Sequence, residues 1–226
     1  MVEAGVTWTG SEPEGILCCI KYSFRCFMSR EYTEVGIKMK IILIPGMGCS
    51  PVARSNWYSW FADEMRKKPN VEVVLKDFPD PNRCRESIWV PFIQKEIGLD
   101  DNTIVVGHSS GAACAMRLLE NDSVAKLRGA ILVAAAHTDL GDECERLSEY
   151  FNRPWDWDKM KLGAECIHCF HGFDDHLIPV EEARYIAEKM SGDNFQYTEM
   201  SDVSHFFRPW EEILTVVDEM ILQDNK

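Results

Sequence analysis

The chain has 226 residues, a formal net charge of −13 and a sequence pI near 4.9. This length suits one domain with a full core, because a domain of this size buries roughly 70% of the surface that its unfolded chain exposes. The acidic balance argues against a nucleic-acid-binding role, which needs basic patches, and against binding to anionic membrane surfaces.

The first part of the chain differs in character from the rest. Residues 1–38 are interpreted as an N-terminal extension of uncertain structure, and residues 39–226 as the folded domain. The extension contains no basic region followed by a long apolar run and a small-residue cleavage site, so it is not expected to be a signal peptide.

From residue 39 onward, apolar runs typical of buried strands alternate with amphipathic stretches. Strands are predicted at residues 39–44, 71–75, 103–106, 130–134, 164–170 and 196–200. Helices are predicted at residues 57–68, 85–97, 112–119, 180–190 and 210–222, with a kink at Pro91. This alternation indicates an α/β fold, a three-layer sandwich with a mainly parallel sheet of roughly six strands.

The most informative motif is Gly107-His108-Ser109-Ser110-Gly111, which joins the predicted strand at residues 103–106 to the predicted helix at residues 112–119. It is the G-x-S-x-G nucleophile elbow in the strand–turn–helix context that gives the motif its meaning. Glycines two residues either side of Ser109 let strand and helix approach closely. Ser109 is therefore the candidate nucleophile.

Two backbone amides are expected to form an oxyanion hole beside this serine. Ser110 opens the following helix, where unpaired N–H groups and a partial positive charge favour a developing anion. The second amide is expected from Met47, in the Gly46-Met47-Gly48 loop after the first predicted strand.

A serine nucleophile needs a general base and an orienting carboxylate, which follow it in the order acid, then histidine, in elbow-type enzymes. Asp174 and Asp175 lie in a turn after the strand at residues 164–170, at the sheet edge where the elbow is expected. An ordinary turn or helix-cap role is the alternative for both. His205 is the candidate base, because it is the only histidine beyond the acidic turn.

Several longer strings are more distinctive than the elbow itself: IPGMG (44–48), WYSW (57–60), RESIWVPF (85–92), DLGDE (139–143) and RPWDW (153–157). With them the chain resembles the α/β-hydrolase superfamily from about Met39 to the C-terminus. Within it, the chain resembles the retinoblastoma-binding protein 9 family of small serine hydrolases. The D-x-x-x-P spacing from Asp175 to Pro179 resembles the acid loop of many α/β-hydrolases and favours Asp175 over Asp174. The resemblance implies a single hydrolase domain, residues 39–226, with the triad Ser109, Asp175 and His205.

That family takes its name from an L-x-C-x-E motif that binds a pocket-type tumour suppressor. No such string occurs here; the nearest, at residues 17–21, ends in lysine. This partner is therefore not carried over, and another protein partner is left open.

The excursion between the strands at residues 130–134 and 164–170 is expected to form a small cap over the nucleophile. Within it, Trp155 and Trp157 are predicted to line the substrate pocket together with His108; anchoring the segment to the sheet is the alternative for the two tryptophans. A cap this short favours small-molecule substrates over folded polymers.

Nine cysteines, an odd number without a secretory leader, are interpreted as reduced thiols in a cytoplasmic protein. The run from Cys166 to His171 carries metal-ligand residue types. In a strand, however, Cys166 and Cys169 point to opposite faces, and no second ligand pair completes a tetrahedral set. Neither a metal site nor a cofactor is expected.

Two functions of different classes fit the sequence. The leading hypothesis is a metal-independent serine hydrolase that cleaves small-molecule esters or amides through an acyl-enzyme intermediate, with no nucleic acid or membrane as partner. The alternative is a non-catalytic protein-interaction module on a hydrolase scaffold. The sequence does not distinguish esterase from peptidase, thioesterase or acyltransferase chemistry, and it is silent on oligomeric state.

Overall fold

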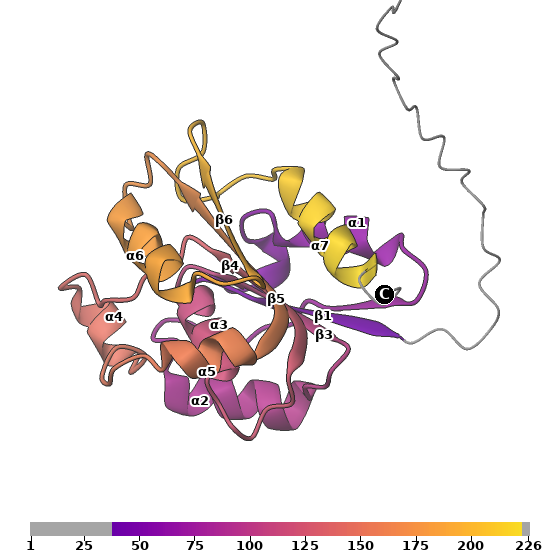
Figure 1. The fold of residues 1–226 in the computed structure, drawn as a ribbon, viewed down its shortest axis with the longest axis horizontal. Helices are drawn as coiled ribbons and strands as arrows, with labels where there is room; N and C mark the ends of the chain where they lie inside the picture. The colour runs from indigo at the N-terminus through magenta and orange to yellow at the C-terminus, as the bar shows by residue number, and fades with distance from the viewer. Residues whose placement is uncertain (1–37, 223–226) are drawn as a thin grey trace, which may run out of the picture. The chain divides into compact units, whose positions relative to one another are not determined.

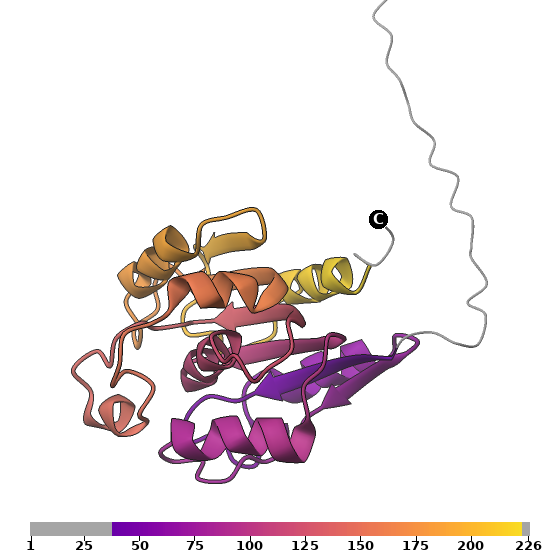
Figure 2. The ribbon, with the colours of Figure 1, turned by 60° about the horizontal axis from the view of Figure 1, so that its bottom comes forward.

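The computed structural model describes residues 38–222, in which a six-stranded sheet lies between two layers of helices (Figures 1 and 2). The strand order is β2-β1-β3-β4-β5-β6 and every neighbouring pair is parallel. The strands are β1 (Met39–Ile44), β2 (Val71–Val74), β3 (Thr103–His108), β4 (Leu127–Val133), β5 (Ala164–Gly172) and β6 (Phe195–Met200). The predicted α/β fold is confirmed, and the sheet is entirely parallel. The expected extension lies, apart from its last residue, outside the described residues.

Apolar side chains from both faces of the sheet form two separate core clusters. One cluster joins the sheet to α1 (Tyr58–Arg66) and α7 (Glu212–Leu222). The other joins it to four helices: α2 (Glu86–Phe92), α3 (Ser110–Leu119), α5 (Trp157–Leu162) and α6 (Val180–Met190). A further helix, α4 (Glu143–Leu147), lies away from the sheet in the excursion between β4 and β5 (Figure 1).

The element boundaries differ from the predictions where local chemistry masks the pattern. β4 begins at Leu127 rather than at residue 130, because Arg128 interrupts the apolar run. The guanidinium of Arg128 donates to the carbonyl of Met220 (2.8 Å) and to Glu165 (2.9 Å), which lets a cation lie within a buried strand. At the expected kink, α2 contains Pro91 and is followed by a π-helical stretch, Ile93–Ile97. The short helices α4 and α5 have no counterpart among the predicted helices.

The elbow lies where the chain order of the sheet reverses. β1 is flanked by β2 on one side and β3 on the other, so the loops that follow β1 and β3 diverge from adjacent carboxyl ends. Such a switch point is where ligands bind in open parallel sheets. The loop after β1 carries Met47, and the loop after β3 carries Ser109.

Strand and helix approach each other closely at this point. A Cβ added to Gly111 would lie 2.5 Å from the carbonyl oxygen of Pro45, and one added to Gly107 would lie 2.8 Å from the Cα of Ala112. Both distances are too short for a real contact, and the atoms met are backbone atoms that cannot rotate away. α3 therefore packs against β1 and β3 through bare backbone.

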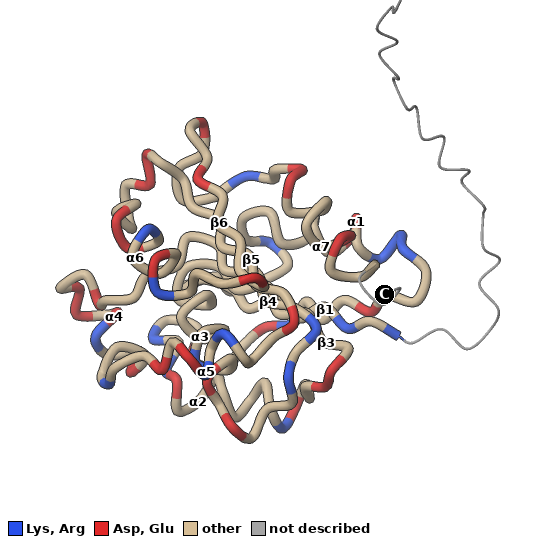
Figure 3. Tube along the Cα trace, in the orientation of Figure 1, with Lys and Arg blue, Asp and Glu red and all other residues tan. Residues whose placement is uncertain are grey.

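Basic and acidic residues are interspersed along the trace of the described chain (Figure 3). Within residues 38–222, no helix is both long enough and apolar enough to cross a membrane.

We expect Gly111→Ala to lower the free energy of unfolding by about 1–3 kcal/mol, because the added methyl group forces α3 away from β1. Gly192→Ala is the matched control, since the atoms nearest to its added Cβ lie at 3.8 Å, an ordinary contact distance. Urea unfolding of both variants measures the difference. Equal stability of the two variants would contradict the close backbone contact between α3 and β1.

Candidate active site

Ser109 lies between the end of β3 and the start of α3. Its backbone conformation is one that residues other than glycine rarely adopt. Its φ is 56° and its ψ is −123°. Its N–H donates to the carbonyl of Val133 at the end of β4 (2.9 Å), and its own carbonyl accepts from Ala112 (2.8 Å). Strained backbone of this kind persists only where the surroundings enforce it, as the close helix–strand contact does here. The turn presents the Ser109 side chain at the edge of the sheet.

Asp175 and His205 form a buried pair at the same edge. Asp175 follows β5 and His205 follows β6, and the Nδ1 atom of His205 lies 2.8 Å from the Oδ2 atom of Asp175. The other carboxylate oxygen of Asp175 accepts from the amides of Leu177 (2.9 Å) and Ile178 (3.0 Å). Asp174 is exposed instead. The structure therefore brings Asp175, and not its neighbour, to the histidine.

The hydrogen bonds around Asp175 favour its ionised form. Burial opposes ionisation, but the hydrogen bonds from His205 and from the amides of Ile178 and Leu177 outweigh it, so the pKa of Asp175 lies below its usual value. A carboxylate can only accept, so the Nδ1 atom of His205 carries the hydrogen. In the neutral imidazole this leaves a lone pair on Nε2, the arrangement a general base requires.

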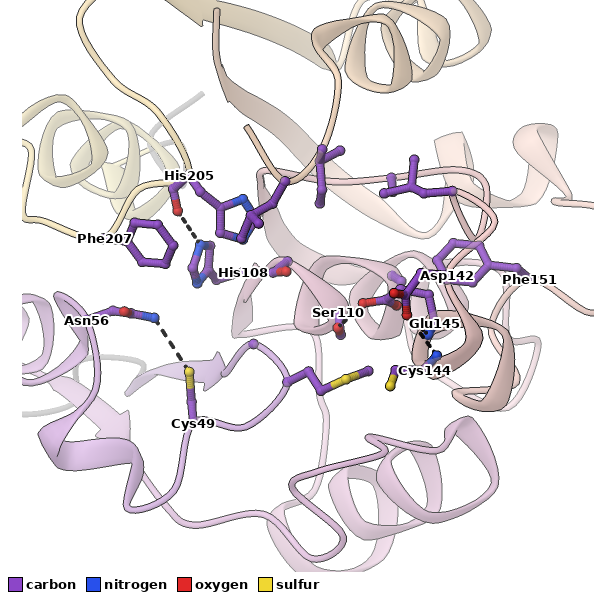
Figure 4. A pocket seen from close by; sticks show the side chains of 18 residues that line it. Cys49, Asn56, His108, Ser110, Asp142, Cys144, Glu145, Phe151, His205 and Phe207 are labelled. Carbon is purple, nitrogen blue, oxygen red and sulfur yellow. Dashed lines mark hydrogen bonds between the residues drawn. The ribbon is translucent and has the colours of Figure 1, made fainter. Parts of the chain in front are cut away.

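Ser109 and His205 both line one cavity of about 600 Å³ (Figure 4). Its polar and charged lining residues come from the segment between β1 and α1, from the elbow, from α4 and its N-cap Asp142, and from the loop after β6, which carries His205. Its apolar lining residues are Met47, Ala113, Ala136, Leu140, Phe151, Leu177, Ile178 and Phe207. Ser110 and Met47, the predicted oxyanion-hole residues, are among the lining residues.

Glu145 is a pocket residue that the sequence analysis did not identify. It comes from α4, and its Oε1 atom accepts a hydrogen bond from the hydroxyl of Ser110 (3.0 Å; Figure 4 shows both side chains). Its Oε2 atom is buried and pairs with no described residue. Burial raises the pKa of Glu145 above its usual value. The short, highly charged α4 sequence reads as a solvated helix, so only the fold reveals that this carboxylate turns inward.

Trp155 and Trp157 lie outside this cavity, in contrast to the predicted pocket role. They line a second, more open depression together with Asp156 and Lys161. The indole N–H of Trp155 donates to the carbonyl of His137 (2.8 Å), and the guanidinium of Arg117 stacks on its ring at 3.7 Å. The two tryptophans therefore pack against the body of the domain, which is the anchoring role considered as the alternative.

The side chain of Arg117 attaches the excursion between β4 and β5 to α3. Its side chain is fully buried on α3, and it donates to the backbone carbonyls of Tyr150 and Arg153 and to the carboxylate of Glu120. Hydrogen bonds to carbonyls and a carboxylate satisfy a guanidinium that would otherwise be costly to bury.

His108 borders the cavity, as predicted, but both of its ring nitrogens are engaged by the protein. Nδ1 lies 2.7 Å from the hydroxyl of Tyr58, and Nε2 lies 3.0 Å from the carbonyl oxygen of His205. Burial is the main reason that the pKa of His108 falls to about 3. The imidazole is therefore neutral at physiological pH, and both of its polar atoms are occupied by protein partners.

Cys166 and Cys169, which belong to the metal-ligand residue types of the run from Cys166 to His171, lie on opposite faces of the sheet in β5. Cys169 packs into the core cluster on the α3 side of the sheet, whereas Cys166 packs against the cluster on the α7 side. Among residues 38–222, no group of three or more histidine, cysteine or acidic side chains is arranged to hold a metal ion.

Comparison with known proteins gives the family. The model of a family described as "Serine hydrolase" matches residues 41–219. The chain belongs to the serine hydrolase family. The rat protein "Serine hydrolase RBBP9" is 39% identical to this serine hydrolase over 183 residues, which cover 80% of this chain and 95% of the relative.

Solved structures share the fold at lower identity. The ydeN gene product of Bacillus subtilis superposes with a TM-score of 0.70 at 22% identity, covering 80% of this chain and 98% of that one. A propionate-bound esterase from Thermogutta terrifontis gives a TM-score of 0.58 at 17% identity, covering 87% of each chain. The α/β-hydrolase fold predicted from the sequence is thus shown, and the roles of individual site residues rest on the geometry above.

The free energy of unfolding is expected to fall as the pH is lowered from about 6.5 towards 3. The unfolded chain takes up a proton on His108 near pH 6.5, whereas the folded chain stays neutral there until about pH 3. The stability from this group is fully present above its unfolded pKa and is lost as the pH approaches its folded pKa. His108→Gln cannot titrate, so its stability should depend less on pH over this range.

Urea unfolding at pH 7, 5.5 and 4 measures the effect in the wild type and in His108→Gln. His168, whose pKa burial lowers to about 4, contributes in the same direction and remains in the variant. Parallel pH dependences in the two proteins would contradict the assignment to His108.

Proposed function

We propose that this serine hydrolase cleaves small esters or amides through an acyl-enzyme intermediate on Ser109. The observation that carries the proposal is the buried hydrogen bond between His205 and Asp175 at the edge of the cavity that Ser109 also lines. A nucleophile, a base with a lone pair on the correct nitrogen and an orienting carboxylate are the three parts that such chemistry requires.

The first half-reaction follows from these positions. The Oγ atom of Ser109 attacks the substrate carbonyl carbon while the Nε2 atom of His205 takes its proton. Asp175 stabilises the resulting imidazolium through Nδ1–H without itself becoming protonated. The imidazolium then gives the proton to the departing alcohol or amine, which leaves the acyl group on Ser109. Water attacks this ester in the second half-reaction, with His205 again acting as base.

The negative charge of the tetrahedral intermediate needs hydrogen-bond donors. Within the described residues, the backbone N–H groups of Met47 and Ser110 donate to no protein acceptor. Both residues line the cavity beside Ser109. Two unpaired amides from adjacent loops are the usual composition of an oxyanion hole, and we assign them that role.

Ser109→Ala should abolish labelling by a fluorophosphonate probe and lower kcat by about 10⁵- to 10⁶-fold. Ser110→Ala should still be labelled, because alanine keeps the backbone N–H on which its role depends. Gel-based labelling and hydrolysis of p-nitrophenyl acetate measure the two effects. An unlabelled wild type would instead support a non-catalytic interaction module, and loss of labelling only in Ser110→Ala would move the nucleophile.

The charge of the cavity wall favours neutral over anionic substrates. Asp142 and Glu145 line the cavity, and its lining contains no lysine or arginine. A carboxylate on the substrate would be repelled in this partly enclosed site, where charges are screened less than in water.

We therefore expect p-nitrophenyl esters of dicarboxylic acids to be hydrolysed with about 10-fold lower kcat/KM than neutral esters of the same length, a difference of about 1.4 kcal/mol. Glu145→Gln should reduce this discrimination. Steady-state kinetics at low and high ionic strength measures both ratios. Equal preference for neutral and anionic esters in the wild type would contradict an electrostatic role of the wall.

A further inference from the structure

The hydroxyl of Tyr58 is a junction between segments that are distant in the sequence. It lies 2.9 Å from the backbone nitrogen of Gly46, 3.2 Å from the side-chain nitrogen of Asn56 and 2.7 Å from the Nδ1 atom of His108. Tyr58 and His108 are both almost completely buried. The catalytic scheme above gives neither of them a chemical step.

The direction of each hydrogen bond follows from what the groups can do. The carbonyl of His205 can only accept, so the Nε2 atom of His108 must carry the hydrogen. Because burial keeps this imidazole neutral, its Nδ1 atom has a lone pair and accepts from Tyr58. The phenol oxygen then accepts from the N–H of Gly46 and from Asn56. Burial raises the pKa of Tyr58, so the phenol keeps the proton that it donates.

These bonds form one continuous path across the active site. The path begins in the oxyanion loop (residues 45–48), passes through Tyr58 and His108, and ends at the backbone of the base loop (residues 201–211). His108 directly precedes the nucleophile in the chain. The oxyanion loop also packs on the nucleophile, since a Cβ on Gly46 would lie 3.3 Å from the Cβ of Ser109. Figure 4 shows the contact of His108 with the carbonyl of His205.

We propose that Tyr58 and His108 are positioning residues that hold the oxyanion loop and the base loop at a fixed separation across Ser109. The inference rests on the proposed function, because it assigns these two loops their roles. Reacting groups displaced by about 1 Å can cost on the order of 100-fold in rate. A hydrogen-bonded path that fixes both loops therefore acts on the transition state, whose oxyanion must meet the amides while His205 reaches the serine.

The hydroxyl can be removed without the ring. The Tyr58 ring packs edge-on against Trp57 (5.1 Å between centroids) and His108 (5.8 Å), and phenylalanine preserves these contacts. Tyr58→Phe thus leaves the N–H of Gly46 without its acceptor and the Nδ1 atom of His108 without its donor. Tyr150→Phe is the matched control, because Tyr150 is equally buried but does not line the cavity.

The test measures kcat, KM, the inhibition constant of an alkylboronic acid and the midpoint of thermal unfolding. For Tyr58→Phe we expect kcat to fall by about 10- to 100-fold, with KM changed by less than about twofold. Affinity for the boronic acid, which forms a tetrahedral adduct on serine, should fall by a similar factor to kcat/KM. Tyr150→Phe should leave all three kinetic quantities at wild-type values, whatever happens to its unfolding midpoint.

A second pair of variants tests the other end of the path. His108→Gln keeps one donor and one acceptor at the end of its side chain, whereas His108→Leu has neither. We expect the glutamine variant to retain more of the wild-type kcat than the leucine variant.

The outcomes separate this inference from the proposed function. A wild type that is not labelled by fluorophosphonate removes both. A labelled wild type together with a folded Tyr58→Phe of unchanged kcat removes the positioning role alone. Equal losses in Tyr58→Phe and Tyr150→Phe, or equal losses in the two His108 variants, would also overturn it, because they would indicate a general effect of core substitution.

Discussion

The candidate site depends on a direct backbone contact between the sheet and α3, the helix that follows Ser109. α3 can lie against β1 and β3 only because Gly111 and Gly107 have no side chains, and any Cβ at either position would overlap main-chain atoms. The chain must turn sharply between these glycines, which places Ser109 in a left-handed conformation. The strain at one residue is thus enforced by packing on both sides of it, and the loop after β1 packs against the same residue through Gly46.

Asp175 and His205 reach the same edge of the sheet through its topology. β5 and β6 are parallel neighbours, so the loops that follow them emerge together at the edge where β1 and β3 also end. Asp175 is then fixed by two amides from its own loop, and it in turn fixes His205.

The fold and the order of the reactive residues could be predicted from the sequence because they depend on local patterns. Apolar periodicity marked each strand of the sheet, and the glycine spacing marked the elbow. The preference for Asp175 over Asp174 came from its spacing to Pro179, and the structure pairs that carboxylate with His205. The roles of the triad residues in catalysis stay a prediction for the labelling experiment to test.

The features that were not predicted depend on contacts between distant segments. A tryptophan pair in a cap suggests a pocket wall, but the indole of Trp155 finds a carbonyl and a buried guanidinium on the body of the domain instead. Glu145 looks solvated in its own helix and becomes part of the cavity only when α4 folds over Ser110. In both cases the surroundings of the side chain depend on which distant segments bury it, and these are known only from the folded chain.

The excursion between β4 and β5, which forms the cap, is attached to one face of α3. Ser110 and Arg117 are seven residues apart on α3, two helical turns, so both project from the same face of the helix. The Ser110 hydroxyl donates to Glu145, and Arg117 donates to the backbone carbonyl of Tyr150, so the cap is tethered at two points to the helix that follows Ser109. Swinging the cap outward would remove the backbone acceptors of the buried Arg117 and leave it only the carboxylate of Glu120. The cap side of the cavity is therefore held in place by α3, whereas the exposed Leu177 and Phe207, which also line the cavity, come from the loops after β5 and β6.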